Sequence, residues 1–279
     1  DHPSAVVEAE PSEEIEVIGA EKAGQFEELT HEAVDALGVP GARLEVVESL
    51  PRHVGLGSGT QHASAVLEAV ALANGAEVTR EHVRALGRGV RSGVGRGVFE
   101  GGGFVVDAGH PPGSAPEDRT VPPVAVRHEL PSDWRFVVAV PEGEGRHGKD
   151  EDRSMKRVVG ADGTAEDVRK EFVARVLPGA AEGEMEAFGT GIGELDRLNG
   201  KWYSESGEQD ETYNEASADL IDLFERKDAV AGTGQSSWGP AVYALTTAES
   251  AEEIADSVDD AETFLAAPDN EGARVSLSS

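Results

Sequence analysis

Apolar and polar residues alternate in several short stretches of the chain, and this spacing predicts β-strands. Successive side chains of a strand point to opposite faces, so an alternating or briefly continuous apolar run can bury one face. The stretch RLEVVE at residues 43–48 is a clear example. The predicted strands are residues 15–18, 43–48, 104–109, 124–130, 136–140, 241–245 and 273–278.

Other stretches carry apolar residues three and four positions apart, which is the spacing of one helical face. In residues 59–73, for example, Val66 and Val70 share a face, and Asn74-Gly75 then provides a typical helix end. The predicted helices are residues 21–37, 59–73, 79–88, 164–176, 183–197, 210–226 and 250–258.

Strands and helices alternate irregularly, which predicts an α+β fold of two layers rather than a doubly wound sheet. Three glycine-rich stretches interrupt the pattern, at residues 53–59, 87–109 and 232–240. A change of composition at residues 111–131 is the best candidate for a domain boundary, and residues 142–153 predict a polar loop.

The charge of the chain narrows its possible partners. Acidic residues outnumber basic ones by 54 to 24, so the formal net charge is −30. Such a charge argues against binding to nucleic acids or to anionic membranes. Acids that are dispersed along the chain are typical of a halophilic protein from a high-salt cell, because salt screens their repulsion. Disorder is the alternative interpretation, and the recurring apolar segments count against it.

Compartment and redox chemistry follow from what the sequence lacks. It contains no cysteine, which excludes disulfides and thiolate catalysis within these residues. It contains no apolar run long enough to span a bilayer and no signal-peptide pattern at Asp1, so we expect a cytoplasmic protein.

The first glycine-rich stretch is a candidate anion site. It follows a predicted strand and opens a predicted helix, so backbone N–H groups and the helix dipole can converge on an anion. No lysine follows Gly59, which excludes the P-loop pattern, and the glycine spacing also differs from the dinucleotide-binding pattern. Glycines that serve chain geometry alone are the alternative. The candidate ligand-binding residues here are Gly55, Gly57, Ser58, Gly59 and Thr60.

A cluster of arginines follows this stretch, in a chain that is otherwise strongly acidic. Its members are Arg80, Arg84, Arg88, Arg91 and Arg96. The planar guanidinium donates two hydrogen bonds at once, which suits phosphate. We expect Arg91 and Arg96, which lie beside glycines, to face a ligand, and the other three to be structural. Surface ion pairs are the alternative for the whole cluster.

Three blocks of sequence together resemble a known superfamily. They are HVGLGSGTQ at residues 53–61, RSGVGRGVFEGGGFVVDAG at 91–109 and GTGQSSWGPAVYAL at 232–245. The first is similar to the central motif of GHMP kinases. The set of three resembles the beta-ribofuranosylaminobenzene 5'-phosphate synthase family, a branch of that superfamily. The resemblance implies a ribosomal S5-like N-terminal domain at residues 1–130 and a ferredoxin-like C-terminal domain at 131–279.

The resemblance also implies a reaction and its residues. The family joins phosphoribosyl diphosphate to 4-aminobenzoate or 4-hydroxybenzoate, with loss of CO₂ and diphosphate, on the route to methanopterin. Mg²⁺ is the expected cofactor, and a phosphorylated small molecule and an aromatic acid are the expected partners. Asp107 and Glu151 are candidate catalytic helpers, although Asp107 could equally cap a turn. The candidate ligand contacts of the third block are Gln235, Ser236 and Ser237, which could also serve the turn.

Other functions of the same fold stay open at this point. One is an ATP-dependent small-molecule kinase, with ATP as its cofactor, and another is a non-catalytic phosphate-binding relative. The family carries an early Arg-Leu-His-Phe-Gly-like block that has no counterpart here, so we expect the first strand and loop of the N-terminal domain to be missing. A homodimer is a further expectation from the resemblance.

Overall fold

The structure is a computed structural model that describes residues 3–19, 23–111, 113–115, 119–141, 164–205, 213, 215–237 and 239–277. Its contacts divide these residues into two compact units. We call residues 3–51, 57–128 and 269–277 the N-terminal unit, and residues 52–56 and 129–268 the C-terminal unit. The predicted domain limits, 1–130 and 131–279, stay a prediction.

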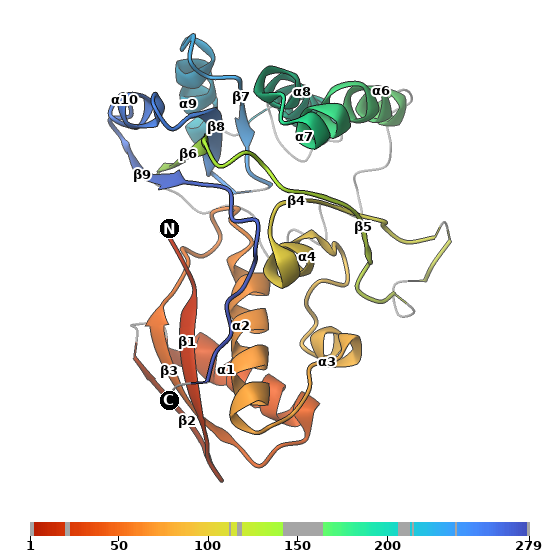
Figure 1. Ribbon diagram of the computed structural model, residues 1–279, viewed down its shortest axis with the longest axis vertical. Helices are drawn as coiled ribbons and strands as arrows, with labels where there is room; N and C mark the ends of the chain where they lie inside the picture. Colours follow the sequence, from red (N-terminus) through yellow and green to blue (C-terminus); the bar gives the residue numbers. More distant parts are fainter. Residues whose placement is uncertain are drawn as a thin grey trace. The chain divides into compact units, whose positions relative to one another are not determined.

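The N-terminal unit is built on a three-stranded sheet in the order β1-β3-β2. Strand β1 (Val6–Pro11) runs antiparallel to β3 (Ala42–Glu48), whereas β2 (Ile15–Gly19) runs parallel to it. Helices α1 (Ala23–Leu37) and α2 (Ser58–Ala73) cover one face of this sheet (Figure 1). The predicted helical stripe is buried there, and the core includes Phe26, Leu29, Leu44, Val46, Val66, Leu67 and Val70.

The rest of this unit consists of shorter elements. Helix α3 (Arg80–Ala85) and helix α4 (Val94–Gly101) follow α2. Strands β4 (Phe104–Asp107) and β5 (Val124–His128) then form an antiparallel ribbon. Residues 269–277 return to this unit from the far end of the chain.

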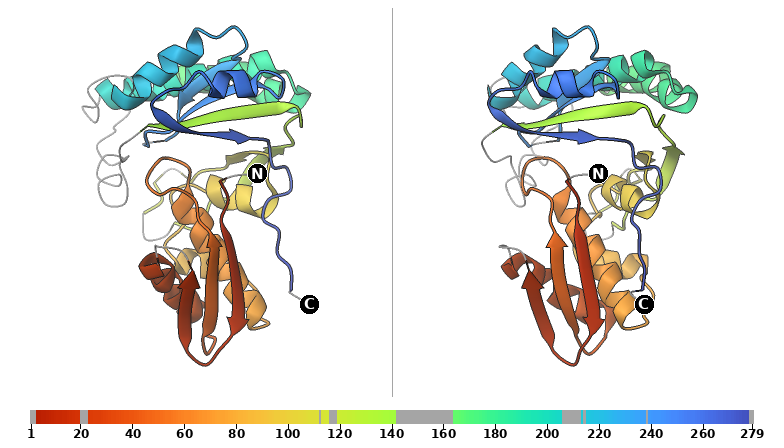
Figure 2. Two further views of the ribbon diagram at one scale, coloured as in Figure 1. Left: turned by 90° about the vertical axis from the view of Figure 1, so that its left-hand side faces the viewer. Right: turned by 60° about the vertical axis from the view of Figure 1, so that its left-hand side comes forward.

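The C-terminal unit is built on a four-stranded antiparallel sheet in the order β7-β8-β6-β9. Its strands are β6 (Trp134–Pro141), β7 (Gly232–Gln235), β8 (Val242–Thr247) and β9 (Ala261–Ala266). The helices of this unit gather on one face of the sheet (Figure 2). They are α6 (Thr164–Glu171), the π-helical turn η2 (Phe172–Val176), α7 (Leu177–Glu182), α8 (Met185–Glu205), α9 (Glu215–Glu225) and α10 (Ala251–Ala255).

Strand β6 supplies both faces of this sheet with apolar side chains. Val137 and Ala139 pack in the cluster that includes α9 and α10, whereas Val140 packs in a second cluster with Val54 and Ala241. Because side chains alternate along a strand, this continuous apolar run buries two surfaces at once. The short segment 52–56 is thereby fixed to the sheet.

Several elements differ from the sequence expectations. The predicted strand at 273–278 is wrong for residues 273–277, which form no strand and are held to α4 by a hydrogen bond from Ala273 N to Phe99 O (2.7 Å). The sequence analysis missed β1, β9 and α4 and assigned the β7 residues to a turn. Helix α3 ends at Ala85 rather than at residue 88, because Gly87 adopts a left-handed conformation (φ 64°) that terminates a helix. Among the described residues, the helices are too short or too polar to span a bilayer.

Candidate functional site

Residues 53–56 form the first half of the first glycine-rich stretch, which is called the glycine turn below. They contact the third glycine-rich block through hydrogen bonds and close backbone packing. Ala241 N donates to Val54 O (3.1 Å), and Ser236 Oγ donates to Gly55 O (3.0 Å). A Cβ on Gly55 would lie 2.1 Å from Ser236 O, and one on Gly239 would lie 2.1 Å from Val54 O. Both glycines are therefore required by this contact, and two of the three blocks meet within the C-terminal unit.

Backbone strain accompanies this contact. His53 (φ 63°) and Ser237 (φ 57°) are non-glycine residues with positive φ, one in each block. Such conformations are costly for residues with a Cβ, and they concentrate where the surrounding structure imposes them, often at functional sites. In the third block, the buried Gln235 side chain stabilises the turn at Ser236 and Ser237, because its Nε2 donates a hydrogen bond to Ser237 O (3.1 Å).

The carboxyl group of Asp196 supports the turn of the third block from helix α8. Asp196, on α8, accepts a hydrogen bond from Gln235 N (2.8 Å) and another from the Tyr213 hydroxyl. Burial raises the pKa of Asp196 to about 7, although both hydrogen bonds oppose this shift. Gly234 makes room for the group, because a Cβ there would lie 2.6 Å from Asp196 Oδ2 and 2.7 Å from the Tyr243 hydroxyl.

The sequence analysis did not identify Asp196. A signal was present, because Asp196 shares a helical face with Gly189, Gly193 and Gly200, at spacings of three and four. Glycines on one helical face let a neighbouring backbone approach closely. An acidic side chain on that face is therefore expected to lie against the neighbouring backbone.

The second half of the glycine turn opens helix α2. Gly57 adopts a left-handed conformation (φ 68°), and no side chain caps the helix start at Ser58. Thr60 N and Gln61 N both donate to Gly57 O (3.0 and 3.2 Å), so the remaining N–H groups of the first turn lie at Ser58 and Gly59. A helix start of this kind favours an anion, and ligand binding by Ser58 and Gly59 stays a prediction.

Arg88 is the arginine that the structure places beside this helix start. A Cβ on Gly59 would lie 3.4 Å from Arg88 Nη1. The sequence analysis predicted a helix over residues 79–88 and expected Arg88 to be structural. Helix α3 ends instead at Ala85, so Arg88 lies beyond it, and its structural role stays a prediction.

The two arginines that were expected to face a ligand differ from each other. Arg96 donates to Glu68 from Nη2 (2.8 Å) and to Glu100 from Nε (2.9 Å), and its side chain is only 11% exposed. It therefore ties α4 to α2, which agrees with the ion-pair alternative. Arg91 is exposed, and its ligand contact stays a prediction.

The second glycine-rich block contacts the first through α4. Gln61 Nε2 donates to Gly95 O (2.9 Å), and a Cβ on Gly95 would lie 3.1 Å from Thr60 Cγ2. The absence of a side chain at Gly95 thus lets the first turns of α2 and α4 approach each other within the N-terminal unit.

Asp107 has a structural task in the second block. Its Oδ2 accepts from Gly93 N (2.7 Å) and Ser92 Oγ (3.0 Å), and its Oδ1 accepts from Gly109 N (2.9 Å). This geometry fits the capping alternative, and a catalytic role stays a prediction.

Glu151, the other candidate helper, lies outside the described residues. Within the described part of the chain, no group of three or more His, Cys, Asp or Glu side chains is placed to hold a metal ion.

Two family models match the chain in order. The N-terminal domain of GHMP kinases matches residues 25–103, and the C-terminal domain of GHMP kinases matches residues 176–262. Together they cover more than half of the chain and include residues of both units.

Curated relatives carry a more specific name. Beta-ribofuranosylphenol 5'-phosphate synthase of Archaeoglobus fulgidus is 35% identical over 74% of this chain and 65% of its own length. Its namesake in Methanothermobacter thermautotrophicus is 34% identical over 70% of this chain and 61% of its own length. The chain thus spans a little under two thirds of the length of these relatives.

Solved structures share the fold at low sequence identity. Homoserine kinase from Cytophaga hutchinsonii superposes with a TM-score of 0.65 at 15% identity, over 98% of this chain and 88% of its own. Mevalonate kinase from Methanococcus jannaschii gives a TM-score of 0.60 at 14% identity, over 95% and 88% of the two chains. The predicted α+β architecture and the predicted family resemblance are both confirmed.

Proposed function

The chain belongs to the GHMP kinase superfamily, and we propose that it acts within it as a phosphoribosyl transferase of the beta-ribofuranosylphenol 5'-phosphate synthase type. The observation that carries the proposal is its identity of 31–35% to three synthases of that name. The proposal concerns the whole protein, of which these residues match only part of each relative.

The proposed reaction balances as a substitution with loss of CO₂. The bond between the ribosyl C1 and diphosphate breaks, and the diphosphate leaves with its bonding electrons. A new bond forms between C1 and the ring carbon that carries the carboxylate, and that carboxylate leaves as CO₂. The relatives are named for a phenol product, which favours 4-hydroxybenzoate over 4-aminobenzoate as the acceptor.

The start of α2 offers what a leaving diphosphate requires. The N–H groups of Ser58 and Gly59 donate hydrogen bonds to phosphate oxygens, and the helix dipole favours the negative charge. The Arg88 guanidinium beside Gly59 adds a charged donor. Stabilising the leaving anion, together with holding the two reactants in line, accounts for most of the catalysis such a site can provide.

The expected Mg²⁺ would arrive with the diphosphate. This ion is commonly held by substrate phosphates and one or two carboxylates, where it neutralises phosphate charge. The described residues hold no cluster of three acidic or histidine ligands, so the protein alone makes no cage for it there. Asp107 and Glu151 stay candidate carboxylates for the proposed reaction.

A second candidate function is an ATP-dependent kinase. The specific observation in its favour is the similarity of the fold to homoserine and mevalonate kinases. The same helix start would then hold the phosphates of ATP rather than a leaving diphosphate.

One assay separates the two functions. The protein is incubated with phosphoribosyl diphosphate and 4-hydroxybenzoate labelled in its carboxyl carbon, and parallel samples contain ATP and candidate alcohols. We expect labelled CO₂ and diphosphate in equal amounts. Formation of ADP, without release of CO₂ in the first mixture, would replace the synthase with the kinase.

A variant at Arg88 tests the proposed diphosphate site. We expect Arg88→Ala to weaken diphosphate binding by about 1.5–3 kcal/mol, the usual range for a hydrogen bond to a charged group. Arg84→Ala, at an exposed arginine of α3, is the matched control. Calorimetric titration with diphosphate measures both. Equal affinities for the two variants would remove Arg88 from the site.

A further inference from the structure

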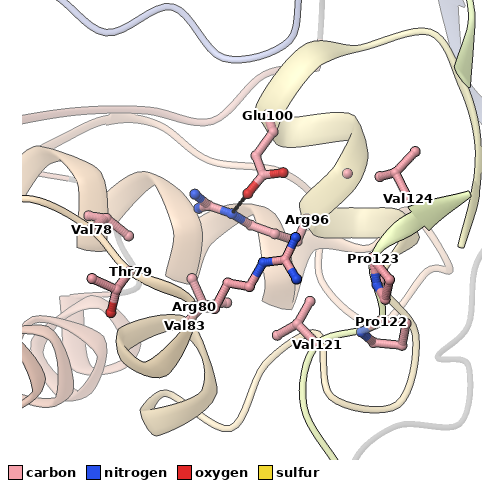
Figure 3. A pocket seen from close by; sticks show the side chains of 12 residues that line it. Val78, Thr79, Arg80, Val83, Arg96, Glu100, Val121, Pro122, Pro123 and Val124 are labelled. Carbon is pink, nitrogen blue, oxygen red and sulfur yellow. Dashed lines mark hydrogen bonds and ion pairs between the residues drawn. The ribbon is translucent and has the colours of Figure 1, made fainter. Parts of the chain in front are cut away.

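The N-terminal unit contains a small cavity that the proposed reaction does not use. It lies between α3, α4 and residues 121–124, and its volume is about 110 Å³ (Figure 3). Half of its twelve lining residues are apolar, and the others are polar, charged or glycine. The apolar lining consists of Val78, Val83, Val121, Pro122, Pro123 and Val124.

Two arginines add positive charge beside this apolar lining. The Arg80 side chain extends into the cavity between Arg96 and the segment that carries Val121 (Figure 3). Arg80 is exposed and is the first residue of α3. Within the described part of the chain, its side chain makes no hydrogen bond or ion pair. Its guanidinium is therefore available to a ligand.

Arg96 supplies a second, incompletely satisfied guanidinium. Its Nε and Nη2 are engaged by Glu100 and Glu68, whereas its Nη1 is buried without a hydrogen-bond partner. A buried donor without an acceptor is costly, and the cost is larger for a charged group. The Arg96 guanidinium therefore keeps one unsatisfied donor, and its side chain lines the cavity.

Close backbone packing fixes the wall around these groups. A Cβ on Gly93 would lie 2.3 Å from Pro122 O, and one on Gly97 would lie 2.8 Å from Val124 Cγ2. Helix α4 therefore lies directly against residues 122–124, and the cavity is formed before any ligand arrives. A preformed site loses less entropy on binding than one that must be ordered.

We propose that this cavity binds a small monocarboxylate with a branched apolar body. A carboxylate matches the planar fork of the Arg80 guanidinium, and the apolar body matches the valine and proline wall. A cavity of about 150 Å³ accommodates benzene, so the smaller volume here suits a body below that size. Glu100 lines the same cavity, and its carboxylate disfavours a ligand with two negative charges.

The proposal does not depend on the proposed transferase activity. It uses Arg80 and the apolar wall, whereas diphosphate binding is assigned to Arg88 and the start of α2. The two sites can therefore be tested on the same protein, and either can fail without the other.

The probe is 3-methylbutanoate, added to the ¹⁵N-labelled protein in a buffer free of other carboxylates. We expect a saturable titration of backbone amides in α3, in α4 and at residue 121. Arg80→Gln should weaken the apparent affinity at least about tenfold, because it removes a charged hydrogen bond. Arg84→Gln, one turn further along α3 and outside the cavity, should leave the affinity unchanged.

Two further ligands test the two halves of the proposed chemistry. The uncharged analogue 3-methylbutan-1-ol should bind at least about tenfold more weakly, because it lacks the carboxylate. Inorganic phosphate should shift these amides more weakly than 3-methylbutanoate does. The proposal is overturned by absence of saturable shifts, by equal affinity of Arg80→Gln and wild type, or by an equal response to the alcohol or to phosphate.

Discussion

Asp196 carries a carboxyl group that the fold withdraws from water and places against the backbone of the third glycine-rich block. Burial raises its pKa to about 7, from 3.8 in an unfolded chain. The folded protein therefore holds a proton that the unfolded chain has already lost between about pH 4 and pH 7. By linkage, the stability that this proton provides is fully present below about pH 4 and is lost as the pH rises through 7.

We expect Asp196→Asn to remove this pH dependence. Asparagine keeps an acceptor oxygen for Gln235 N and cannot ionise. At one pKa unit per 1.36 kcal/mol, the wild type should lose up to about 4 kcal/mol more stability than the variant between pH 4 and pH 8. Urea unfolding at both pH values measures the difference. Asp219→Asn, at an exposed position of α9, is the control and should follow the wild type. Parallel curves for wild type and Asp196→Asn would show that Asp196 does not titrate in this range.

Single site residues were predictable only where a local pattern marked them. Ser236 and Gln235 were singled out because glycines surround them. Both take part in the turn of the third block, and their ligand contacts stay a prediction. The roles of Arg88 and Arg96 depended on where α3 ends and on which acids lie nearby in space. Neither fact is written in the spacing of the arginines, so the sequence analysis extended the helix to Arg88 and left the ion pairs of Arg96 as the alternative.

Among the elements, the contact between α8 and β7 depends on missing side chains. A Cβ on Gly232 would lie 2.0 Å from Gly189 O, and one on Gly189 would lie 2.5 Å from Ala231 O. The two backbones can approach this closely only because both residues are glycine. The strand β7 in turn carries Gln235 to the site, so the packing of one pair of elements sets the position of the turn.

We expect Gly232→Ala to destabilise the protein by about 1–3 kcal/mol, the range for overpacking a tight contact. Gly24→Ala is the matched control, because a Cβ at Gly24 in α1 would meet nothing within 4 Å. That substitution should be neutral or stabilise by up to about 1 kcal/mol, since it reduces the entropy of the unfolded chain. Urea unfolding midpoints measure both, and equal midpoints would contradict the contact.

Regular apolar spacing allowed α2 and β3 to be predicted, whereas the short, glycine-rich elements α4 and β7 were not. Helix α2 and strand β3 have regular apolar spacing, and the structure places both in the core of the N-terminal unit. Helix α4 contains three glycines in eight residues, and β7 contains two in four, so propensity argued against both. Their conformations are determined by tertiary contacts such as those of Gly97 and Gly232.

The molecule as a whole carries a net charge of −30, and this charge opposes the compact state by self-repulsion. Ions shorten the range of that repulsion to about 10 Å at 0.1 M salt and about 3 Å at 1 M.

The architecture and family were predictable at this scale because three separate blocks supplied mutually consistent signals. The charge, by contrast, says nothing about the fold and concerns the conditions under which it persists.

We expect the thermal unfolding midpoint to rise with KCl concentration, with most of the gain below about 1 M, where the screening length changes most. Circular dichroism during heating measures the midpoint. Titration with sucrose is the control, since sucrose strengthens apolar burial without screening charge. A midpoint that is constant or falls with KCl would show that self-repulsion does not limit stability.

Residues 269–277 add a consequence for synthesis on the ribosome. Gly103 N donates to Asp269 O (2.7 Å) and Ala273 N to Phe99 O (2.7 Å), so this segment closes over α4. Residues 3–128 leave the ribosome long before it, because the whole of 129–268 is translated in between. At about 5–20 residues per second, the delay is on the order of ten seconds. During that time Phe99 O and Gly103 N lack the partners that residues 269–277 supply, so the N-terminal unit is completed only after residues 129–268 have been made.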